Sequence, residues 1–202
     1  MVTILDLEMS NLGSLKSALH TINQKFIVTN DVELIKESKY LILPGVGAFG
    51  DGINKLKLLK LDKVIKNLHK KSVPILGICL GMQLLAKSSN ENGHNKGLNI
   101  FDHDVKRFSN KKVKRIPNIG WCKISIKKNI DLLKDIKNMS YFYFLHSYYL
   151  KASSKINCAE TSNNQCSFSC VVKNNKTFGV QFHPEKSHDF GLILLSNFCS
   201  LK

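Results

Sequence analysis

The sequence has 202 residues, of which 43% are hydrophobic and 8% aromatic, a composition typical of a globular domain with a sizeable core. Its formal net charge is +15, yet only Arg107 and Arg115 are arginine among the 30 basic residues. Nucleic-acid readers favour the bidentate arginine side chain, and the lysines are scattered along predicted helical faces, so we expect a solvated basic surface and no nucleic-acid partner.

The first 78 residues alternate short β-rich runs with helical patterns. We expect strands at Thr3–Asp6, Phe26–Thr29, Tyr40–Leu43 and Val73–Ile78. Helical patterns cover Ser14–Ile22, a short stretch capped by Asn30 or Asp31, and residues 51–70. This alternation predicts an α/β fold with a mostly parallel central sheet flanked by helices on both faces, with functional loops at the carboxyl edge of the sheet.

The second half of the chain is richer in strands, which are separated by polar turns. We expect them at Phe101–Phe108, Gly120–Ile126, Ser140–Leu145, Asn157–Thr161, Phe168–Lys173 and Thr177–Phe182. A helix over Ser187–Cys199 ends the chain. Since no linker, repeat or low-complexity segment interrupts the pattern, residues 1–202 are expected to form one domain.

Neither a membrane nor a metal is expected. No segment reaches the ~20 apolar residues of a spanning helix, and Met1–Asp6 lacks the charged and then apolar order of a signal peptide. We therefore expect a cytoplasmic protein whose six cysteines are reduced thiols. None of them forms a Cys-x-x-Cys pair, so structural zinc is not expected.

One of these cysteines lies in a distinctive setting. Residues 77–81 read GICLG, so Cys79 stands between two glycines where an apolar strand gives way to a helical pattern. This is the form of a nucleophile elbow, in which glycines keep side chains out of a crowded turn and the nucleophile is exposed at the sheet edge. On this pattern alone, a buried structural cysteine remains an equal alternative.

Thiol chemistry on an acyl group also needs a base and a group that orients the base. Residues 179–185 read GVQFHPE and supply both after a predicted strand. Glu185 lies two positions after His183 and reaches the same side if the chain stays extended. A single His-x-Glu is more often surface or core, but its occurrence at the same sheet edge as Cys79 favours catalysis.

A third loop, Pro44–Gly47, follows the strand at Tyr40–Leu43. Its glycines allow a backbone N–H to face a developing oxyanion. An ordinary turn is an alternative of equal weight. A phosphate loop is not expected, because no Gly-Lys-Ser/Thr follows.

Taken together, four motifs resemble the class I, triad-type glutamine amidotransferases, a flavodoxin-like family. They are PGVGAF at 44–49, GICLGMQ at 77–83, HSYY at 146–149 and GVQFHPEKS at 179–187. Within that family the chain is most similar to glutaminase subunits of imidazole glycerol phosphate synthase. The resemblance covers essentially the whole chain, with the motifs in the same order.

The resemblance implies roles for nine residues. Cys79 would attack the amide of glutamine, His183 would serve as acid and base, and Glu185 would orient His183. The backbone N–H groups of Val46 and Leu80 would form the oxyanion hole. The residues matching glutamine-binding positions are Gly47, Gln83, Ser147 and Tyr148. No metal or cofactor is implied, and the ammonia would pass to a separate (β/α)₈-barrel cyclase subunit in a heterodimer.

Two segments depart from the family pattern. Residues 6–12 read DLEMSNL where Asp-Tyr-Gly-x-Gly-Asn-Leu is usual, and residues 117–122 read PNIGWC where Pro-His-x-Gly-Trp-Asn is usual. In the family both segments lie toward the synthase partner. The histidine-pathway synthase is therefore the leading expectation, and a paralogue that feeds ammonia to a surface-sugar amidination enzyme is the alternative. A stand-alone γ-glutamyl hydrolase and a non-catalytic scaffold are lesser ones.

Overall fold

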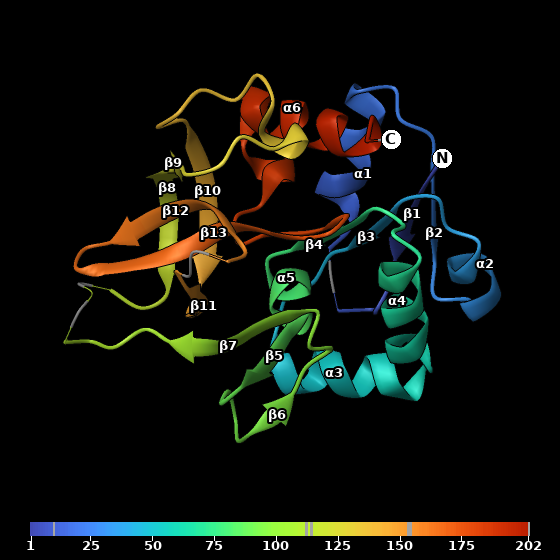
Figure 1. Ribbon diagram of the computed structural model, residues 1–202, viewed down its shortest axis with the longest axis horizontal. Helices are drawn as coiled ribbons and strands as arrows, with labels where there is room; N and C mark the ends of the chain where they lie inside the picture. The colour runs from blue at the N-terminus through green and yellow to red at the C-terminus, as the bar shows by residue number, and fades with distance from the viewer. Residues whose placement is uncertain (10, 112, 114, 153–154, 202) are drawn as a thin grey trace.

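The structure is a computed structural model that describes residues 1–9, 11–111, 113, 115–152 and 155–201 (Figure 1). Ser10, within the N-terminal segment that departs from the family pattern, lies outside the described residues. No helix in the described part of the chain has the length and apolar character required to cross a membrane.

Five parallel strands form one half of the main sheet, in the order β2-β1-β3-β4-β14. Their bounds are β1 Val2–Leu5, β2 Phe26–Thr29, β3 Leu41–Leu43, β4 Ile75–Ile78 and β14 Thr177–Val180. The last strand comes from the end of the chain and pairs with β4, so the C-terminal motif is brought beside the cysteine motif. The parallel strands predicted from residues 1–78 are confirmed.

The second half of the chain extends this sheet with mainly antiparallel pairs, in the order β14-β13-β11-β7-β5-β6. These strands are β5 Ala86–Ser89, β6 Asn95–Lys96, β7 Phe101–Arg107, β11 Tyr148–Lys151 and β13 Cys166–Asn174. β12 (Asn157–Asn163) pairs with β13 and with β9 (Ser125–Ile126). A separate two-stranded sheet pairs β8 (Asn118–Lys123) with β10 (Tyr141–His146).

Helices cover both faces of the parallel strands, as the sequence predicts (Figure 1). α1 (Gly13–Thr21) and α6 (His188–Cys199) pack on one face. α2 (Val32–Lys36), α3 (Phe49–Leu58), α4 (Leu61–Lys70) and α5 (Leu80–Leu84) pack on the other. The alternation of side chains along a strand divides the core: in β3, Ile42 faces the first group, and Leu41 and Leu43 face the second.

Local sequence accounts for several of these boundaries. The side chain of Asp31 accepts hydrogen bonds from the N–H groups of Glu33 and Leu34, so it caps α2 as predicted. The helical pattern predicted over residues 51–70 is confirmed and forms two helices, because Lys60 adopts a left-handed conformation (φ 57°) and divides the segment into α3 and α4. The strands β5, β6 and β11 were not predicted, since they are short and lack a long apolar run.

Candidate active site

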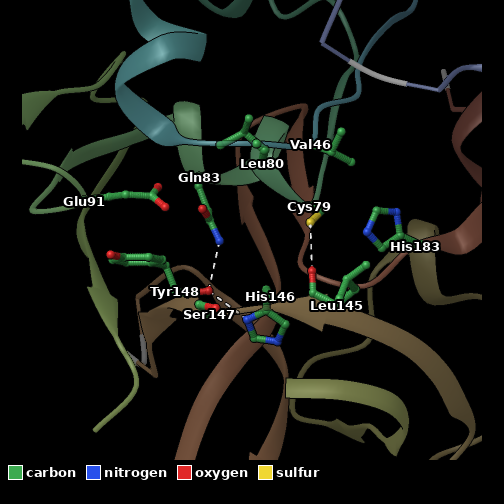
Figure 2. A pocket seen from close by; sticks show the side chains of 11 residues that line it. Val46, Cys79, Leu80, Gln83, Glu91, Leu145, His146, Ser147, Tyr148 and His183 are labelled. Atoms are coloured by element: carbon green, nitrogen blue, oxygen red, sulfur yellow. Dashed lines mark hydrogen bonds between the residues drawn. The ribbon is translucent and has the colours of Figure 1, made fainter. Parts of the chain in front are cut away.

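Three neighbouring parallel strands end at one edge of the sheet, and their loops enclose a pocket of about 230 Å³ (Figure 2). Its walls contain eight of the nine residues singled out from the sequence. The lining residues are Val46, Gly47, Cys79, Leu80, Gln83, Glu91, Leu145, His146, Ser147, Tyr148 and His183. The ninth, Glu185, lies behind His183 as its hydrogen-bond partner.

Cys79 occupies a tight turn between β4 and α5. Its backbone has a positive φ of 54° with ψ −108°, an unusual conformation for a residue with a side chain. The flanking glycines are required by close packing. A Cβ on Gly81 would lie 1.7 Å from the carbonyl oxygen of Leu43, and one on Gly77 would lie 2.7 Å from the N atom of Met82. The nucleophile-elbow geometry predicted from the sequence is confirmed.

The Cys79 side chain is almost fully enclosed, with 6% of the residue exposed. Its sulfur lies 3.7 Å from the carbonyl oxygen of Leu145, which accepts from the thiol, and 3.8 Å from Nε2 of Gln181. In Figure 2 the ring of His183 lies beside the sulfur. The pocket therefore presents a single thiol to a small ligand, and all six cysteines of the chain are free thiols.

His183 and Glu185 are brought together by a turn of 3-10 helix. Nδ1 of His183 lies 2.8 Å from Oε1 of Glu185, and both side chains are largely buried. The predicted contact is present, but the extended geometry proposed for it is wrong: Glu185 lies in the 3-10 turn Pro184–Lys186. Since Nδ1 faces the carboxylate, the buried Nε2 atom is the one left for chemistry at the sulfur.

The surroundings of His183 favour its protonated form. Burial lowers the pKa of His183, but interaction with Cys79 and with Glu185, through hydrogen bonding and charge, outweighs burial and raises it to about 10. The imidazolium is therefore the predominant form at neutral pH. A proton is available at the atom beside the sulfur before any substrate arrives.

The oxyanion hole expected from the sequence is not formed. The N–H of Leu80 donates to the carbonyl oxygen of Gly45, with an N–O distance of 3.3 Å. The peptide between Gly45 and Val46 is trans, since the only cis bond among the described residues is Ile116–Pro117. A planar trans peptide directs its C=O and N–H in opposite directions, so the Val46 N–H points away from Leu80. One donor is occupied and the other is turned away.

The residues expected to hold glutamine line the opposite wall. Gln83 is 5% exposed and donates from Nε2 to the carbonyl oxygen of Tyr148 at 3.0 Å. Ser147 connects β10 to β11, and Tyr148 begins β11; both lie along that wall, as Figure 2 shows. Gly47 follows β3 and has a φ of 106°, which favours glycine strongly over any other residue.

Four residues of the site were missed by sequence reasoning, one of which is Leu145, whose carbonyl oxygen faces the sulfur. Glu91 lies in the pocket wall and accepts from the N–H of Phe49 at 2.8 Å. Gln181 is fully buried beneath the sulfur. His146 ends β10 and lines the pocket. Gln181 and His146 lie inside the quoted motifs GVQFHPE and HSYY, whereas no local pattern marks Glu91 or Leu145, because their places depend on long-range packing.

His146 is a neutral histidine held by two partners. Burial lowers its pKa to about 4; the hydrogen bond to Tyr148 opposes this effect and the charge of His183 adds to it. Nδ1 lies 2.7 Å from the carbonyl oxygen of Tyr148, and Nε2 lies 3.0 Å from Nδ2 of Asn118. Asn118 belongs to one of the segments that depart from the family pattern, so that departure reaches the pocket wall.

No group of three or more His, Cys, Asp or Glu side chains within the described part of the chain is arranged to hold a metal ion. The pocket contains a thiol, a buried imidazolium with its carboxylate, and the N–H of Leu80, which the carbonyl of Gly45 occupies. This set can transfer an acyl group to sulfur and then to water.

Comparisons with known proteins agree with this geometry. A family model described as "Glutamine amidotransferase class-I" matches residues 3–199. The chain is 42% identical over 201 residues to "Imidazole glycerol phosphate synthase subunit HisH 2" of Methanococcus maripaludis, with 98% of each chain covered. It is also 42% identical over 198 residues to the HisH subunit of Pyrococcus furiosus, covering 98% of this chain and 97% of that one.

Solved structures share the fold at lower identity. One described as "Crystal structure of glutamine amidotransferase" has a TM-score of 0.75 at 17% identity, with 98% of both chains covered. "Structure of PurLQS from Thermotoga maritima" has a TM-score of 0.73 at 16% identity, covering 98% of this chain and 96% of that one. These two likenesses bear on the fold alone, whereas the family model and the 42% identical relatives cover nearly the whole sequence. The chain therefore belongs to the class I glutamine amidotransferase family.

Proposed function

We propose that this chain is the glutaminase subunit of imidazole glycerol phosphate synthase, acting as one domain over residues 1–202. It hydrolyses L-glutamine to glutamate and passes the ammonia to a (β/α)₈-barrel cyclase subunit in histidine biosynthesis. The observation that carries the proposal is the convergence of Cys79 and the His183–Glu185 pair on one pocket of about 230 Å³. A pocket of this size suits a single small metabolite.

The first half of the reaction forms a thioester. The Cys79 sulfur attacks the side-chain carbonyl carbon of glutamine, a C–S bond forms, and the carbonyl oxygen becomes an oxyanion. His183 gives its Nε2 proton to the amide nitrogen, the C–N bond breaks, and ammonia leaves. Because the pKa of His183 is raised to about 10, this proton is present at neutral pH.

The second half consumes water. His183, now neutral, takes a proton from a water molecule as that molecule attacks the glutamyl thioester. The C–S bond breaks, Cys79 regains its thiolate, and glutamate leaves with His183 protonated again. Glu185 keeps Nδ1 of the ring protonated throughout, so that Nε2 is the atom that exchanges the proton. No metal or organic cofactor takes part in this scheme.

The polar end of glutamine would be held at the opposite wall. The carboxylate of Glu91 and the side-chain oxygen of Gln83 are acceptors that suit an α-ammonium group. Gly47, Ser147 and Tyr148 complete the wall that surrounds the substrate.

A partner subunit is supported by apolar side chains exposed beside the pocket. Val46 is 45% exposed and Leu145 is 39% exposed, and both line the pocket itself. Ile119 and Trp121 are also exposed, and Ile119 lies directly opposite Leu145 in the β8–β10 pair. A cyclase subunit covering this face would bury these side chains and receive ammonia without its release to solvent.

The names of the relatives support the cyclase, rather than a sugar-amidating enzyme, as the ammonia acceptor. The proteins that are 42% identical over the whole chain bear the name of the imidazole glycerol phosphate synthase subunit. No observation favours a sugar-amidating partner, although Asn118 and Cys122 replace the usual family residues.

The test is glutamate release by the chain alone, with the cyclase, and with the cyclase plus its nucleotide substrate. We expect turnover mainly in the third mixture. Cys79→Ser should abolish it while leaving the cyclase active with ammonium salt. A chain that releases no glutamate in any mixture, or that responds only to a sugar-amidating enzyme, would contradict the proposal.

A further inference from the structure

A buried glutamine beneath the nucleophile has no place in the scheme above. Gln181 follows β14, has no exposed surface, and is absent from the pocket lining, so it does not touch the substrate. Its backbone N–H donates to the carbonyl oxygen of Cys170, which fixes its position against β13. Its side-chain amide lies between two functional residues, Gln83 and Cys79.

The direction of these side-chain amides is set by a backbone carbonyl. The oxygen of Tyr148 can only accept, so the atom of Gln83 that lies 3.0 Å from it must be Nε2. The second hydrogen of that NH₂ group then goes to Gln181, whose facing atom must be Oε1, at 3.0 Å. It follows that Nε2 of Gln181 faces the sulfur of Cys79, at 3.8 Å.

The carbonyl of Tyr148 is itself held firmly. Nδ1 of the neutral His146 donates to it at 2.7 Å, and Asn118 donates to the other ring nitrogen. Both acceptor positions of the oxygen are therefore in use. The hydrogen-bond chain leads from β8 to the nucleophile, with His146 and Gln83 both donating to the oxygen of Tyr148, and Gln181 is its last member.

The two polar atoms of the Gln181 side chain, Oε1 and Nε2, therefore have different roles. Its Oε1 uses the second hydrogen of Gln83, which leaves the oxygen of Gln83 as that residue's remaining group for the substrate. Its Nε2 places a donor beside the sulfur, and the carbonyl of Leu145 places an acceptor 3.7 Å from the same atom. A donor favours thiolate and an acceptor favours thiol, so the amide opposes the effect of the carbonyl.

We propose that Gln181 is a positioning residue of the glutaminase site, which favours the thiolate of Cys79 through Nε2 and orients the amide of Gln83 through Oε1. The part that concerns Gln83 rests on the proposed function. The part that concerns the sulfur does not, because thiol reactivity can be measured on the protein alone.

Other ionisable groups face Cys79, and each stays unchanged when Gln181 is replaced. His183 lies after β14 with Glu185 behind it, and His146 ends β10. Glu91 and Tyr148 lie in the pocket wall. A change in the pH dependence of the thiol on replacing Gln181 with an uncharged residue therefore reports the lost donor.

The first experiment compares Gln181→Met with wild type and with Gln165→Met. Gln181→Met adds no charge but removes the N–H beside the sulfur. Gln165 is an exposed residue in the turn between β12 and β13, so its replacement makes the same change far from the site. We measure the rate of Cys79 alkylation by iodoacetamide against pH on the isolated chain.

We expect the midpoint of alkylation to rise by about one pH unit in Gln181→Met, equivalent to a tenfold loss of thiolate at pH 7. Gln165→Met should match wild type. An unchanged midpoint in folded Gln181→Met would overturn the role of Nε2. Should that variant fail to fold, the side-chain NH₂ signals of Gln181 in the wild-type protein serve instead. The chemical shifts of these NH₂ signals should change with pH at the same midpoint as the alkylation rate. Shifts that stay constant through that midpoint would overturn the role of Nε2.

The second experiment tests the role of Oε1 of Gln181 in orienting Gln83. Gln181→Met removes the acceptor as well as the donor, so Gln83 loses a partner and KM for glutamine should rise about tenfold in the presence of the cyclase. Gln181→Glu keeps the acceptor toward Gln83, so it should leave KM within about threefold of wild type. A loss of folded protein lowers kcat at constant KM, so it does not imitate this result. A wild-type KM in Gln181→Met would overturn the role of Oε1, whereas inactive wild-type protein would count against the proposed function alone.

Discussion

Replacing Val46 with proline tests how the oxyanion hole is completed. Leu80 donates to the carbonyl oxygen of Gly45 at 3.3 Å, and the trans peptide turns the Val46 N–H away. Rotating that one peptide would release Leu80 and bring the Val46 N–H toward the oxyanion. A proline at this position has no N–H, so rotation would supply only one of the two donors.

The magnitude follows from the chemistry of oxyanion stabilisation. Removal of one donor costs ~2.7–4 kcal/mol of transition-state stabilisation, which is ~10²–10³ in rate. We expect the cyclase with bound nucleotide to stimulate the wild-type chain at least about a hundredfold, because both donors are then gained. In Val46→Pro only the Leu80 donor is gained, so the stimulated rate should be ~10²–10³ below that of the wild type.

The assay is steady-state glutamate release with the chain alone, with the cyclase, and with the cyclase plus its nucleotide ligand. Val46→Ala is the matched control, since it removes the exposed apolar side chain but keeps the N–H. Ammonium-dependent turnover by the cyclase should be the same with every variant. Full stimulation of a folded Val46→Pro chain, or full-speed hydrolysis by the isolated wild type, would refute the reasoning.

Three further predictions concern the triad and its neighbour. The inhibitor 6-diazo-5-oxo-norleucine should label Cys79 and none of the other five cysteines, which peptide mass mapping would reveal. Glu185→Gln should reduce turnover less than His183→Ala does. It should also move the alkaline limb of kcat/KM to lower pH, because the carboxylate helps to raise the pKa of His183 to about 10. His146 has a folded-state pKa of about 4 against an ordinary 6.5, so the unfolded chain binds its proton first. The stability that the neutral ring contributes is therefore present above pH 6.5 and lost as the pH falls toward 4. Between these two pH values the Tm of His146→Gln should fall less than the Tm of the wild type. An equal fall in the two proteins would contradict this assignment.

The parts of the site that could be predicted from sequence are those fixed by local rules. A cysteine between glycines at the end of an apolar strand requires a tight turn, because Gly81 approaches Leu43 too closely for a side chain. Parallel strands share their carboxyl edge, so the loops after β3, β4 and β14 had to meet. Even the contact between His183 and Glu185 was predictable from spacing, although a 3-10 turn forms it.

The parts that could not be predicted depend on contacts between residues far apart in the sequence, or on a peptide group that can rotate at little cost. Glu91 reaches the pocket only because α3 begins beside it, and no local pattern marks that contact. His146 was quoted within a motif, but its role depends on Asn118, which is 28 positions earlier. The orientation of the Gly45–Val46 peptide has no sequence signal, since glycine accepts both orientations at little cost.

The residues that face the expected partner are also the residues whose peptide groups hold the site at rest. The carbonyl of Gly45 occupies the N–H of Leu80, and the next side chain along, Val46, is exposed. The carbonyl of Leu145 accepts from the thiol of Cys79, and the side chain of Leu145 is exposed on the same face. A subunit that packs against Val46 and Leu145 would contact side chains only a few covalent bonds away from the carbonyl groups of Gly45 and Leu145. Binding of the partner and formation of the oxyanion hole are therefore coupled through neighbouring atoms of the same loops, and no long-range pathway through the protein is required.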